Sequence, residues 1–499
     1  MAGPAWSAPF EEFVEEFVER RGLPGVSVGV AEKGREVYVR GFGLADREEK
    51  RAITPDTIYG IGSITKSFTS LAVMQLAEAG RLDLDAPVTA HAPELARVFG
   101  DRAAATTLRH FMSHSTGMPP LPVLMAALRT SMEADPDAKD DLKEVDDAVR
   151  MDSVDDHAAH IELLRRLPFP WLGAPGEHFS YSNDCYGLLG LIIERASGVS
   201  YERYVEEHIL RPAGLTRTLF DHGALAAMGD VATSYTRRRP AKDQAEAAKA
   251  SDGPPEVVRS PAWWWASAQT AAGFLKSSAR DLLRYIELYQ GSGRAGGAAL
   301  LSPAGVGRMT APAMAITPTT AYGYGLALER YAGLDIVQHS GGLKAISAFV
   351  LTVPEERLSV SVLINLGGEG AGRVGMAVVN ALLGRDPAAL APVPAEVALP
   401  AERSLYTGRY YSGESMDDLE IQAAGGGLVM VSDGKRQRMQ PVGDGYFVAG
   451  EGAERSWLRP LVRDGRVFAL QAGSRIWARH ELWDAAGYPT LRPAAQASR

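Results

Sequence analysis

Four residues near the start of the chain, Ser63-Ile64-Thr65-Lys66, form the first arrangement that could do chemistry. A serine hydroxyl is a weak nucleophile near neutral pH and needs a base within hydrogen-bond distance. In a helix, Lys66 lies one turn after Ser63 and shares its face. Burial and neighbouring cations can lower the pKa of a lysine until it accepts a proton. The tetrad therefore predicts a serine nucleophile with a lysine base, although Ser-x-x-Lys alone is a weak motif.

Two later segments add groups that such a nucleophile would use. In Tyr181-Ser182-Asn183, the tyrosine supplies a second acid or base, and the asparagine supplies an amide to orient a lysine or a substrate carbonyl. His339-Ser340-Gly341-Gly342 follows directly after an apolar segment that is typical of a strand. Small residues there would let a substrate lie along the strand edge.

The order Ser-x-x-Lys, Tyr-x-Asn, His-x-Gly resembles the β-lactamase and penicillin-binding-protein superfamily. The branch is that of class C β-lactamases, D-aminopeptidases and related esterases. The flanking blocks Tyr59–Thr69, Leu108–Pro119, Phe179–Asn183 and Ala272–Asp281 also resemble this branch and occur in the same order. The resemblance covers residues 8 to about 385 of the chain.

The resemblance implies a role for each matched residue. Ser63 would be the acylated nucleophile, Lys66 its base, and Tyr181 the group that passes a proton to the leaving group. Asn183 would orient Lys66 or the substrate amide, and His339 would replace the family's lysine near any substrate carboxylate. The substrate-binding strand would comprise His339, Ser340, Gly341 and Gly342. The oxyanion hole would be formed by the backbone N–H of Ser63 and of a residue just after Gly341, between Gly342 and Lys344.

Hydrophobic periodicity predicts the elements that must position these groups. Apolar residues at helical spacing predict a helix from Ser63 to Gly80, and further helices at 187–194 and 201–210. Alternating segments predict an antiparallel sheet with strands at 26–30, 36–40, 324–328, 336–338, 346–353 and 358–364. The expected fold class is therefore α+β, a β-lactamase-like sheet flanked by helices with an all-helical subdomain, over residues 1–385.

A second, smaller domain is predicted after a proline-rich linker at 386–400. Short alternating segments at 401–485 are separated by Asp433-Gly434, Asp444-Gly445 and Asp464-Gly465, which are typical of hairpin turns. They predict a small all-β barrel or sandwich. Leu405–Tyr410 and these hairpins resemble the lipocalin-like barrel appended to some serine peptidases and peptide cyclases of this superfamily. Residues 486–499 are expected to form a tail.

Two segments are open to more than one interpretation. The acidic stretch at 121–165 predicts a charged, largely helical insertion, and the alternative is a lid over the site. The three adjacent tryptophans Trp263-Trp264-Trp265 cannot all face one way, so they are either core residues or, in part, the wall of a substrate pocket.

Several histidines are expected to be structural. His114 is interpreted as part of a helix C-terminus capped by Gly117. His157 and His160 lie near carboxylates, and a solvated acidic helix is favoured over a metal site. The site is accordingly expected to need no metal and no cofactor.

Composition excludes some partners. The net charge of −9, from 52 basic and 61 acidic residues, argues against nucleic acid or an anionic membrane as a main partner. The single cysteine, Cys185, cannot form an intramolecular disulfide and is expected in the core. Met1 to Arg21 lacks the pattern of a secretory signal, so a cytoplasmic location is expected.

The sequence favours a serine peptidase or amidase that acts through an acyl-enzyme on short peptides, which could contain D-residues. An esterase, a β-lactamase-like hydrolase and an acyltransferase that closes peptide rings would use the same motifs. The expected partner is a small molecule or short peptide, and homo-oligomerisation is left open. A barrel that restricts access to the site is one interpretation of the C-terminal domain.

Overall fold

A nine-stranded antiparallel sheet runs through the larger part of the protein. The computed structural model describes residues 4–138, 142, 152–238, 255–260, 263–432 and 434–488. The strands are, in sheet order, β10 (Met314–Thr317), β11 (Thr320–Tyr322), β12 (Ala327–Tyr331), β13 (Leu334–Leu343), β14 (Ile346–Val353), β15 (Leu358–Ile364), β1 (Gly25–Glu32), β2 (Arg35–Asp46) and β3 (Arg51–Ala52). This confirms the predicted α+β fold class with an antiparallel sheet.

The middle of the sheet is covered on both faces. Every residue of β14 and β15 is buried. Since side chains alternate along a strand, Phe349 and Leu351 join one apolar cluster while Ala348 and Val350 join another on the opposite face. The continuous apolar pattern of these strands follows from this double burial.

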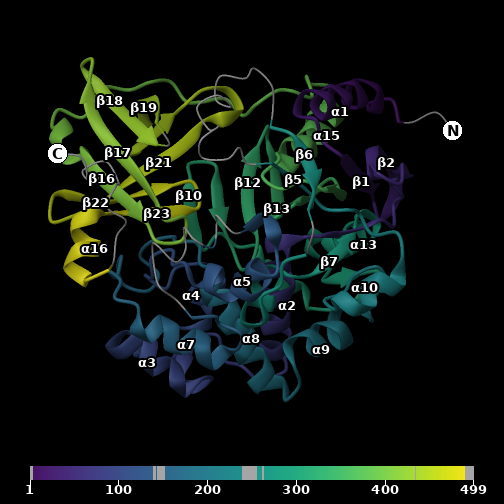
Figure 1. Cartoon of the computed structure of the whole chain (residues 1–499), viewed down its shortest axis with the longest axis horizontal. Coiled ribbons are helices and arrows are strands. Elements are labelled where there is room, and N and C mark those ends of the chain that lie inside the picture. The colour runs from purple at the N-terminus through teal and green to yellow at the C-terminus, as the bar shows by residue number, and fades with distance from the viewer. Residues whose placement is uncertain are drawn as a thin grey trace.

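One face of the sheet is packed by two helices from distant parts of the sequence. They are α1 (Ser7–Arg21) and α15 (Ala371–Leu382), which lie side by side (Figure 1). The inward face of α1 carries Phe10, Phe13 and Phe17, all buried and spaced three or four residues apart, as one face of a helix requires. The first helix therefore belongs to the core of the sheet rather than to the surface alone.

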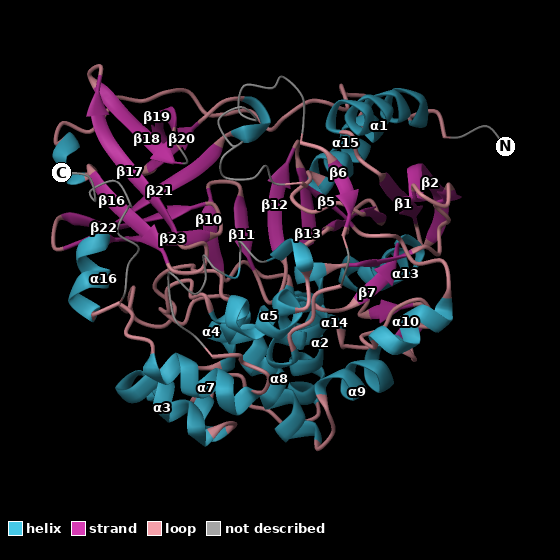
Figure 2. Ribbon diagram, in the orientation of Figure 1, coloured by secondary structure: helices cyan, strands magenta, loops and turns pink. Residues whose placement is uncertain are grey.

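The other face is packed by α13 (Ala279–Ile286) and by a helical region (Figure 2). The helices of that region are α2 (Thr65–Glu78), α3 (Ala96–Phe99), α4 (Leu108–Met112), α5 (Val123–Glu133), α7 (His157–Arg166), α8 (Asn183–Ser197), α9 (Tyr201–Val205), α10 (His222–Met228), α12 (Thr270–Gly273) and α14 (Pro303–Met309). Three short strand pairs connect them: β4 (Ile58–Gly60) with β7 (Lys276–Ser278), β5 (Tyr235–Arg237) with β6 (Val257–Arg259), and β8 (Arg294–Ala295) with β9 (Ala298–Ala299).

The acidic insertion is in part a core element. The inner face of α5 is buried, including Val123, Leu128 and Met132. On α7, His160 is fully buried, so the expectation of a solvated helix is wrong for that side chain. Residues 139–141 and 143–151 of the insertion lie outside the described residues.

The C-terminal region is a closed eight-stranded barrel. Its strands are β16 (Gly408–Ser412), β17 (Asp417–Ala424), β18 (Gly427–Ser432), β19 (Lys435–Gly443), β20 (Tyr446–Ala449), β21 (Ser456–Arg463), β22 (Arg466–Ala472) and β23 (Arg475–Arg479). In the Asp444-Gly445 and Asp464-Gly465 turns both residues have positive φ, as a tight hairpin turn requires. The predicted barrel is therefore confirmed, and Asp433 lies outside the described residues.

The barrel shares a core with the first domain. Residues 386–400, which the structure describes throughout, contain no helix or strand. On the barrel, Tyr411 and Phe468 join the apolar cluster of the helical region, as does Trp483 of α16 (His480–Ala486). Packing continues to Tyr488, whose ring lies 4.6 Å from that of Trp483. Nowhere in the described ranges is a helix both long and apolar enough to cross a bilayer.

Candidate active site

Ser63 lies in a single 3-10 turn, Gly62–Ile64, between β4 and α2. Buried Ile61 and Ile64 flank it and anchor the turn, which leaves Ser63 half-buried at the surface of the site. Gly62 has φ +49, and a Cβ there would lie 2.5 Å from the backbone nitrogen of Gly342. The turn therefore requires glycine both for its conformation and for the close approach of β13.

Lys66 is fully buried one turn after Ser63. Its Nζ lies 3.0 Å from Ser63 Oγ, 2.8 Å from Asn183 Oδ1 and 2.6 Å from the Ala272 carbonyl oxygen. Burial lowers the pKa of Lys66 well below its usual range, and the charge of Arg475 lowers it further. A neutral amine has two N–H groups for the two oxygens, which leaves its lone pair directed at the Ser63 hydroxyl.

Tyr181 and Asn183 occupy the start of α8, where the Ser182 side chain accepts a hydrogen bond from the Cys185 N–H and caps the helix. Burial raises the pKa of the Tyr181 hydroxyl above its usual range, so it is protonated near neutral pH. The hydroxyl lies close enough to Ser63 for that serine to lower the hydroxyl pKa in part. The helix start thus brings an O–H group and an amide oxygen to the same pair, Ser63 and Lys66.

The segment His339–Gly342 lies on β13 beyond the end of its pairing with β12, with β14 on one side and the Ser63 turn on the other. A Cβ on Gly341 would lie 1.9 Å from the Ile61 carbonyl oxygen and 3.2 Å from the Ser63 nitrogen. Only glycine fits there. Strand β13 and the Ser63 turn, each with backbone N–H groups, therefore meet at the nucleophile.

His339 is buried on β13, and both of its ring nitrogens contact protein atoms. Nε2 lies 2.8 Å from the Tyr322 hydroxyl and Nδ1 lies 2.6 Å from the Ser340 carbonyl oxygen. Because a carbonyl only accepts, Nδ1 carries the proton and Nε2 accepts from Tyr322. Burial lowers the pKa of His339 to about 3. The ring is neutral, and contact with a substrate carboxylate stays a prediction.

His114 is a member of the site that the sequence interpretation treated as a helix end. Its ring stacks on that of Tyr181 at a centroid distance of 4.1 Å, and its Nδ1 accepts the Ser182 N–H at 3.0 Å. The helix α4 ends earlier, with Ser113 at its C-cap, so Gly117 is not the cap. The segment Leu108–Pro119, which contains His114, resembles the family in sequence, but residue spacing does not reveal that His114 stacks on Tyr181.

Two barrel residues also reach the site. Glu414 lies in the β16–β17 turn, where its Oε1 accepts the Asn183 amide N–H at 2.5 Å and its Oε2 pairs with Arg475. The Arg475 guanidinium lies 4.3 Å from the centroid of the Tyr181 ring. The Tyr181 N–H donates to the carbonyl oxygen of Ser474 at 3.1 Å. No local sequence pattern indicated these residues.

The three tryptophans have different environments. Trp264 is buried, and its Nε1 donates to Asp135 Oδ2 at 2.7 Å, where Lys344 also forms an ion pair. Trp264 is therefore a core residue that ties the end of α5 to the β13–β14 turn. Trp265 lines a cavity of about 970 Å³ together with Phe220 and other residues, but Ser63 is not among the lining residues.

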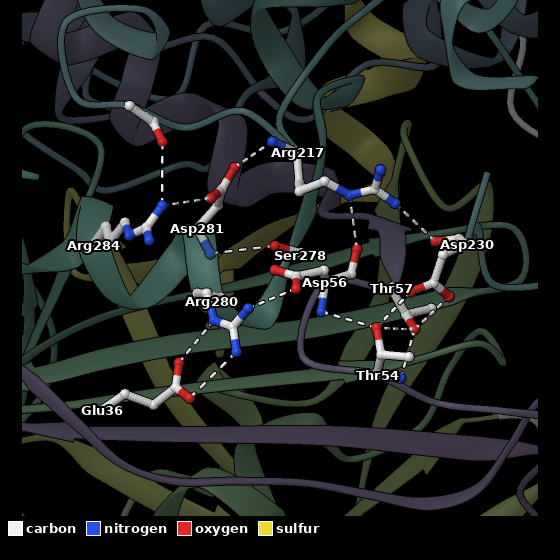
Figure 3. Close-up of polar contacts among 11 residues, drawn as sticks. Glu36, Thr54, Asp56, Thr57, Arg217, Asp230, Ser278, Arg280, Asp281 and Arg284 are labelled. Carbon is white, nitrogen blue, oxygen red and sulfur yellow. Dashed lines mark hydrogen bonds and ion pairs between the residues drawn. The ribbon is translucent and has the colours of Figure 1, made fainter. Parts of the chain in front are cut away.

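A cluster of ion pairs and hydrogen bonds fixes the segment that leads into β4 (Figure 3). The Arg217 side chain donates to the carbonyl oxygens of Asp56 and of residues 228–230. Asp281 of α13 accepts the backbone N–H of Arg217 at 2.7 Å. Arg280, also on α13, pairs with the Asp56 carboxylate. These bonds hold the segment that leads into β4 and the Ser63 turn, and they do not involve the reacting groups.

Other candidate groups play no part in the site. Cys185 is buried, and burial raises the pKa of its thiol to about 12, so it is the core residue that was predicted. His157 contacts Glu194, and His160 lies near Asp184. Within the described residues, no group of three or more His, Cys, Asp or Glu side chains could hold a metal ion.

Comparisons with known proteins show the family of this chain. The family model described as Beta-lactamase matches residues 10–385. Protein flp of Staphylococcus aureus (strain MW2) is 26% identical over 365 residues, which are 72% of this chain and 63% of flp. This chain thus spans less than two thirds of the length of that relative.

Two proteins of solved structure match almost the whole chain. The octameric penicillin-binding protein homologue from Pyrococcus abyssi is 27% identical with a TM-score of 0.64, covering 95% of this chain and 100% of that protein. SurE is 25% identical with a TM-score of 0.66, covering 95% of this chain and 98% of SurE. A structure of SurE with D-Leu matches at 24% identity with a TM-score of 0.67, covering 95% and 98%.

Proposed function

Because the chain belongs to the β-lactamase family, a family of serine hydrolases, we propose that it cleaves amide bonds of short peptides through an acyl-enzyme on Ser63. One observation carries the proposal. The buried Lys66 amine donates to two fixed oxygens and directs its lone pair at Ser63 Oγ, 3.0 Å away. This is the geometry that a general base needs.

Acylation begins when the Ser63 hydroxyl proton moves to Lys66 Nζ as Oγ attacks the substrate carbonyl carbon. The developing oxyanion is then stabilised by the backbone N–H groups of Ser63 and of Gly342, which the meeting of β13 with the 3-10 turn brings together. Both donors belong to rigid backbone, so they need no reorganisation during the reaction.

Tyr181 completes the acylation step. Its protonated hydroxyl gives a proton to the leaving amine and is reprotonated from the Lys66 ammonium. The leaving group departs as a neutral amine, and Lys66 is again neutral. A water molecule then attacks the ester carbonyl carbon and passes its proton through the Tyr181 hydroxyl to Lys66. The tetrahedral intermediate collapses to the carboxylic acid as the Lys66 ammonium returns that proton to Ser63 Oγ, which restores the free serine.

The proposal of a short substrate is supported by the barrel residues Glu414 and Arg475. They contact Asn183 and Tyr181, so the barrel lies next to the site. The structure of SurE with D-Leu is the reason to include peptides with D-residues. Ester hydrolysis, β-lactam hydrolysis and ring-closing acyl transfer use the same acyl-enzyme, so they are tested as alternatives in the same experiment.

A fluorophosphonate probe followed by intact-mass measurement tests the nucleophile. We expect stoichiometric labelling of the natural sequence, none of Ser63→Ala and strongly slowed labelling of Lys66→Met. Ser292→Ala, which changes an exposed serine, is the matched control and should label normally. Equal labelling of Ser63→Ala would overturn the assignment of the nucleophile.

A substrate panel separates the alternatives. It contains D- and L-aminoacyl anilides, a chromogenic lactam, a short-chain ester, and an activated peptide ester with an internal amine. Turnover of anilides supports the amidase proposal. Fast ester or lactam turnover without anilide turnover contradicts it, and release of a cyclic product identifies acyl transfer.

The octameric relative supports a further proposal, that this chain also forms a homo-oligomer. Size-exclusion chromatography with light scattering should then give a mass that is a multiple of 53.5 kDa. A monomeric mass at micromolar concentration would contradict it.

A further inference from the structure

The barrel contributes side chains to the groups that act on Ser63, which is more than a wall around the site needs. Glu414 accepts the Asn183 side-chain N–H at 2.5 Å, and Asn183 in turn accepts from Lys66 Nζ at 2.8 Å. Arg475 holds the other carboxylate oxygen of Glu414 and covers the Tyr181 ring. A continuous chain of contacts therefore runs from the barrel to the proposed base.

The Asn183 amide can make these contacts in only one orientation. Asparagine presents an oxygen acceptor on one side and an NH₂ donor on the other. A carboxylate only accepts, so Glu414 forces the NH₂ of Asn183 outward and its oxygen toward Lys66. Asn183 is 8% exposed and the Glu414 side chain 16% exposed, so little water competes with either bond.

The reversed orientation of the Asn183 amide would disturb the contacts of Lys66. With its amide reversed, Asn183 would present NH₂ to the amine of Lys66. Lys66 would lose one of its two acceptors, and its lone pair would turn from the Ser63 hydroxyl toward the amide hydrogen. A Lys66 amine whose lone pair can point away from the Ser63 hydroxyl is a poor base for that hydroxyl.

We infer that Glu414 and Arg475 of the barrel are positioning residues for the proposed acylation: Glu414 fixes the amide of Asn183 so that Lys66 faces Ser63, and Arg475 holds Glu414 and the Tyr181 ring. The active site is thus built from both domains. This inference rests on the proposed function. Removing the barrel would then abolish acylation rather than widen the range of substrates.

The two charges act on Lys66 in opposite directions. The Glu414 carboxylate raises the pKa of Lys66, whereas the Arg475 guanidinium lowers it. Asp184 on α8, His114 after α4 and His339 on β13 also face Lys66. So do the rings of Tyr181 and Tyr186, whose hydroxyl pKa values burial raises. Burial holds both histidines neutral and raises the pKa of Asp184. None of these groups therefore reverses the opposite effects of Glu414 and Arg475 on the pKa of Lys66.

The test compares Glu414→Gln, Arg475→Met and the matched control Glu451→Gln, which changes an exposed barrel carboxylate. The rate of fluorophosphonate labelling is measured as a function of pH for each full-length variant, with thermal melting as a check on folding. We expect Glu414→Gln to slow labelling about 10- to 100-fold, a typical effect of a group that orients a reacting residue. Its acidic limb should shift to lower pH, and that of Arg475→Met to higher pH.

A double-mutant cycle with Asn183→Ala isolates the amide. If Glu414 acts through Asn183, Glu414→Gln should have less than about a threefold effect once Asn183 is alanine. Full additivity, or acidic limbs that move together in the two variants, would show that Glu414 and Arg475 only dock the barrel. Labelling of the natural sequence is the separate control, because its absence would contradict the proposed function instead.

Discussion

Gly341→Ala is the most direct test of the proposed oxyanion hole. The new Cβ would lie 1.9 Å from the Ile61 carbonyl oxygen, whereas carbon and oxygen normally approach to roughly 3.3 Å. Strand β13 and the Ser63 turn must therefore separate by about 1.4 Å. The φ of Gly341 is an ordinary strand value, so the requirement for glycine comes from space alone.

The size of the effect follows from this displacement. The N–H groups of Ser63 and Gly342 sit on opposite sides of the contact, and an oxyanion can stay bonded to only one of them after a shift of that size. Losing one such donor costs about 100- to 1,000-fold in rate, or roughly 3 to 4 kcal/mol. We expect this loss in the acylation rate constant, because the donors act on charge that develops in the transition state.

The assay is the rate of Ser63 labelling by an activated ester, with near-UV circular dichroism and thermal melting to establish that the variant is folded. Gly307→Ala in α14, where an added Cβ meets nothing within 4 Å, is the matched control and should acylate normally. A folded Gly341→Ala variant that acylates within about threefold of the natural sequence would refute the assignment of the oxyanion hole to this contact.

Three further predictions concern stability and are read from denaturant unfolding. Arg217→Met removes the guanidinium donor from four backbone carbonyl oxygens, of which that of Asp230 keeps the Ile58 N–H. The change should cost about 2 kcal/mol, while the exposed control Arg35→Met should cost almost nothing. Equal losses would contradict the role of the cluster. Burial lowers the pKa of Lys276 from 10.5 to about 7, so unfolding takes up a proton between these pH values and the natural sequence gains stability as pH rises. Lys276→Met should therefore be the more stable protein at pH 7, with an advantage that falls by about 4 kcal/mol toward pH 10.5, and a constant difference would refute this. Lys344→Met leaves the buried Asp135 carboxylate unpaired and should cost about 3 kcal/mol, most of which Asp135→Asn should restore; no restoration would contradict the pairing.

Much of the fold could be predicted from the sequence because its signals are local. The nearly continuous apolar pattern of 346–353 and 358–364 reports burial of both faces of those strands, and the Asp-Gly pairs report turns that need positive φ. The Ser63 and Lys66 geometry is equally local, since one helical turn fixes it. Each of these predictions depends on residues that are neighbours in the sequence.

The remaining features depend on contacts between distant segments. Nothing near Glu414 indicates that it bonds to Asn183, because that contact arises only when the barrel docks. The stacking of His114 on Tyr181 depends on the end of α4 lying against the start of α8. The insertion was predicted to be charged and largely helical, but the burial of the apolar face of α5 is visible only once its partners are known.

The pairing of β1 with β15 has a consequence for the order in which the protein can mature on the ribosome. Strand β1, near the start of the chain, cannot take its place between β2 and β15 until residue 364 has left the exit tunnel. The positioning inferred for Arg475 would delay a working site further, until barrel strand β23 has been made. The nascent chain would thus carry Ser63 and Lys66 through the synthesis of both domains before the barrel groups that orient Lys66 are in place.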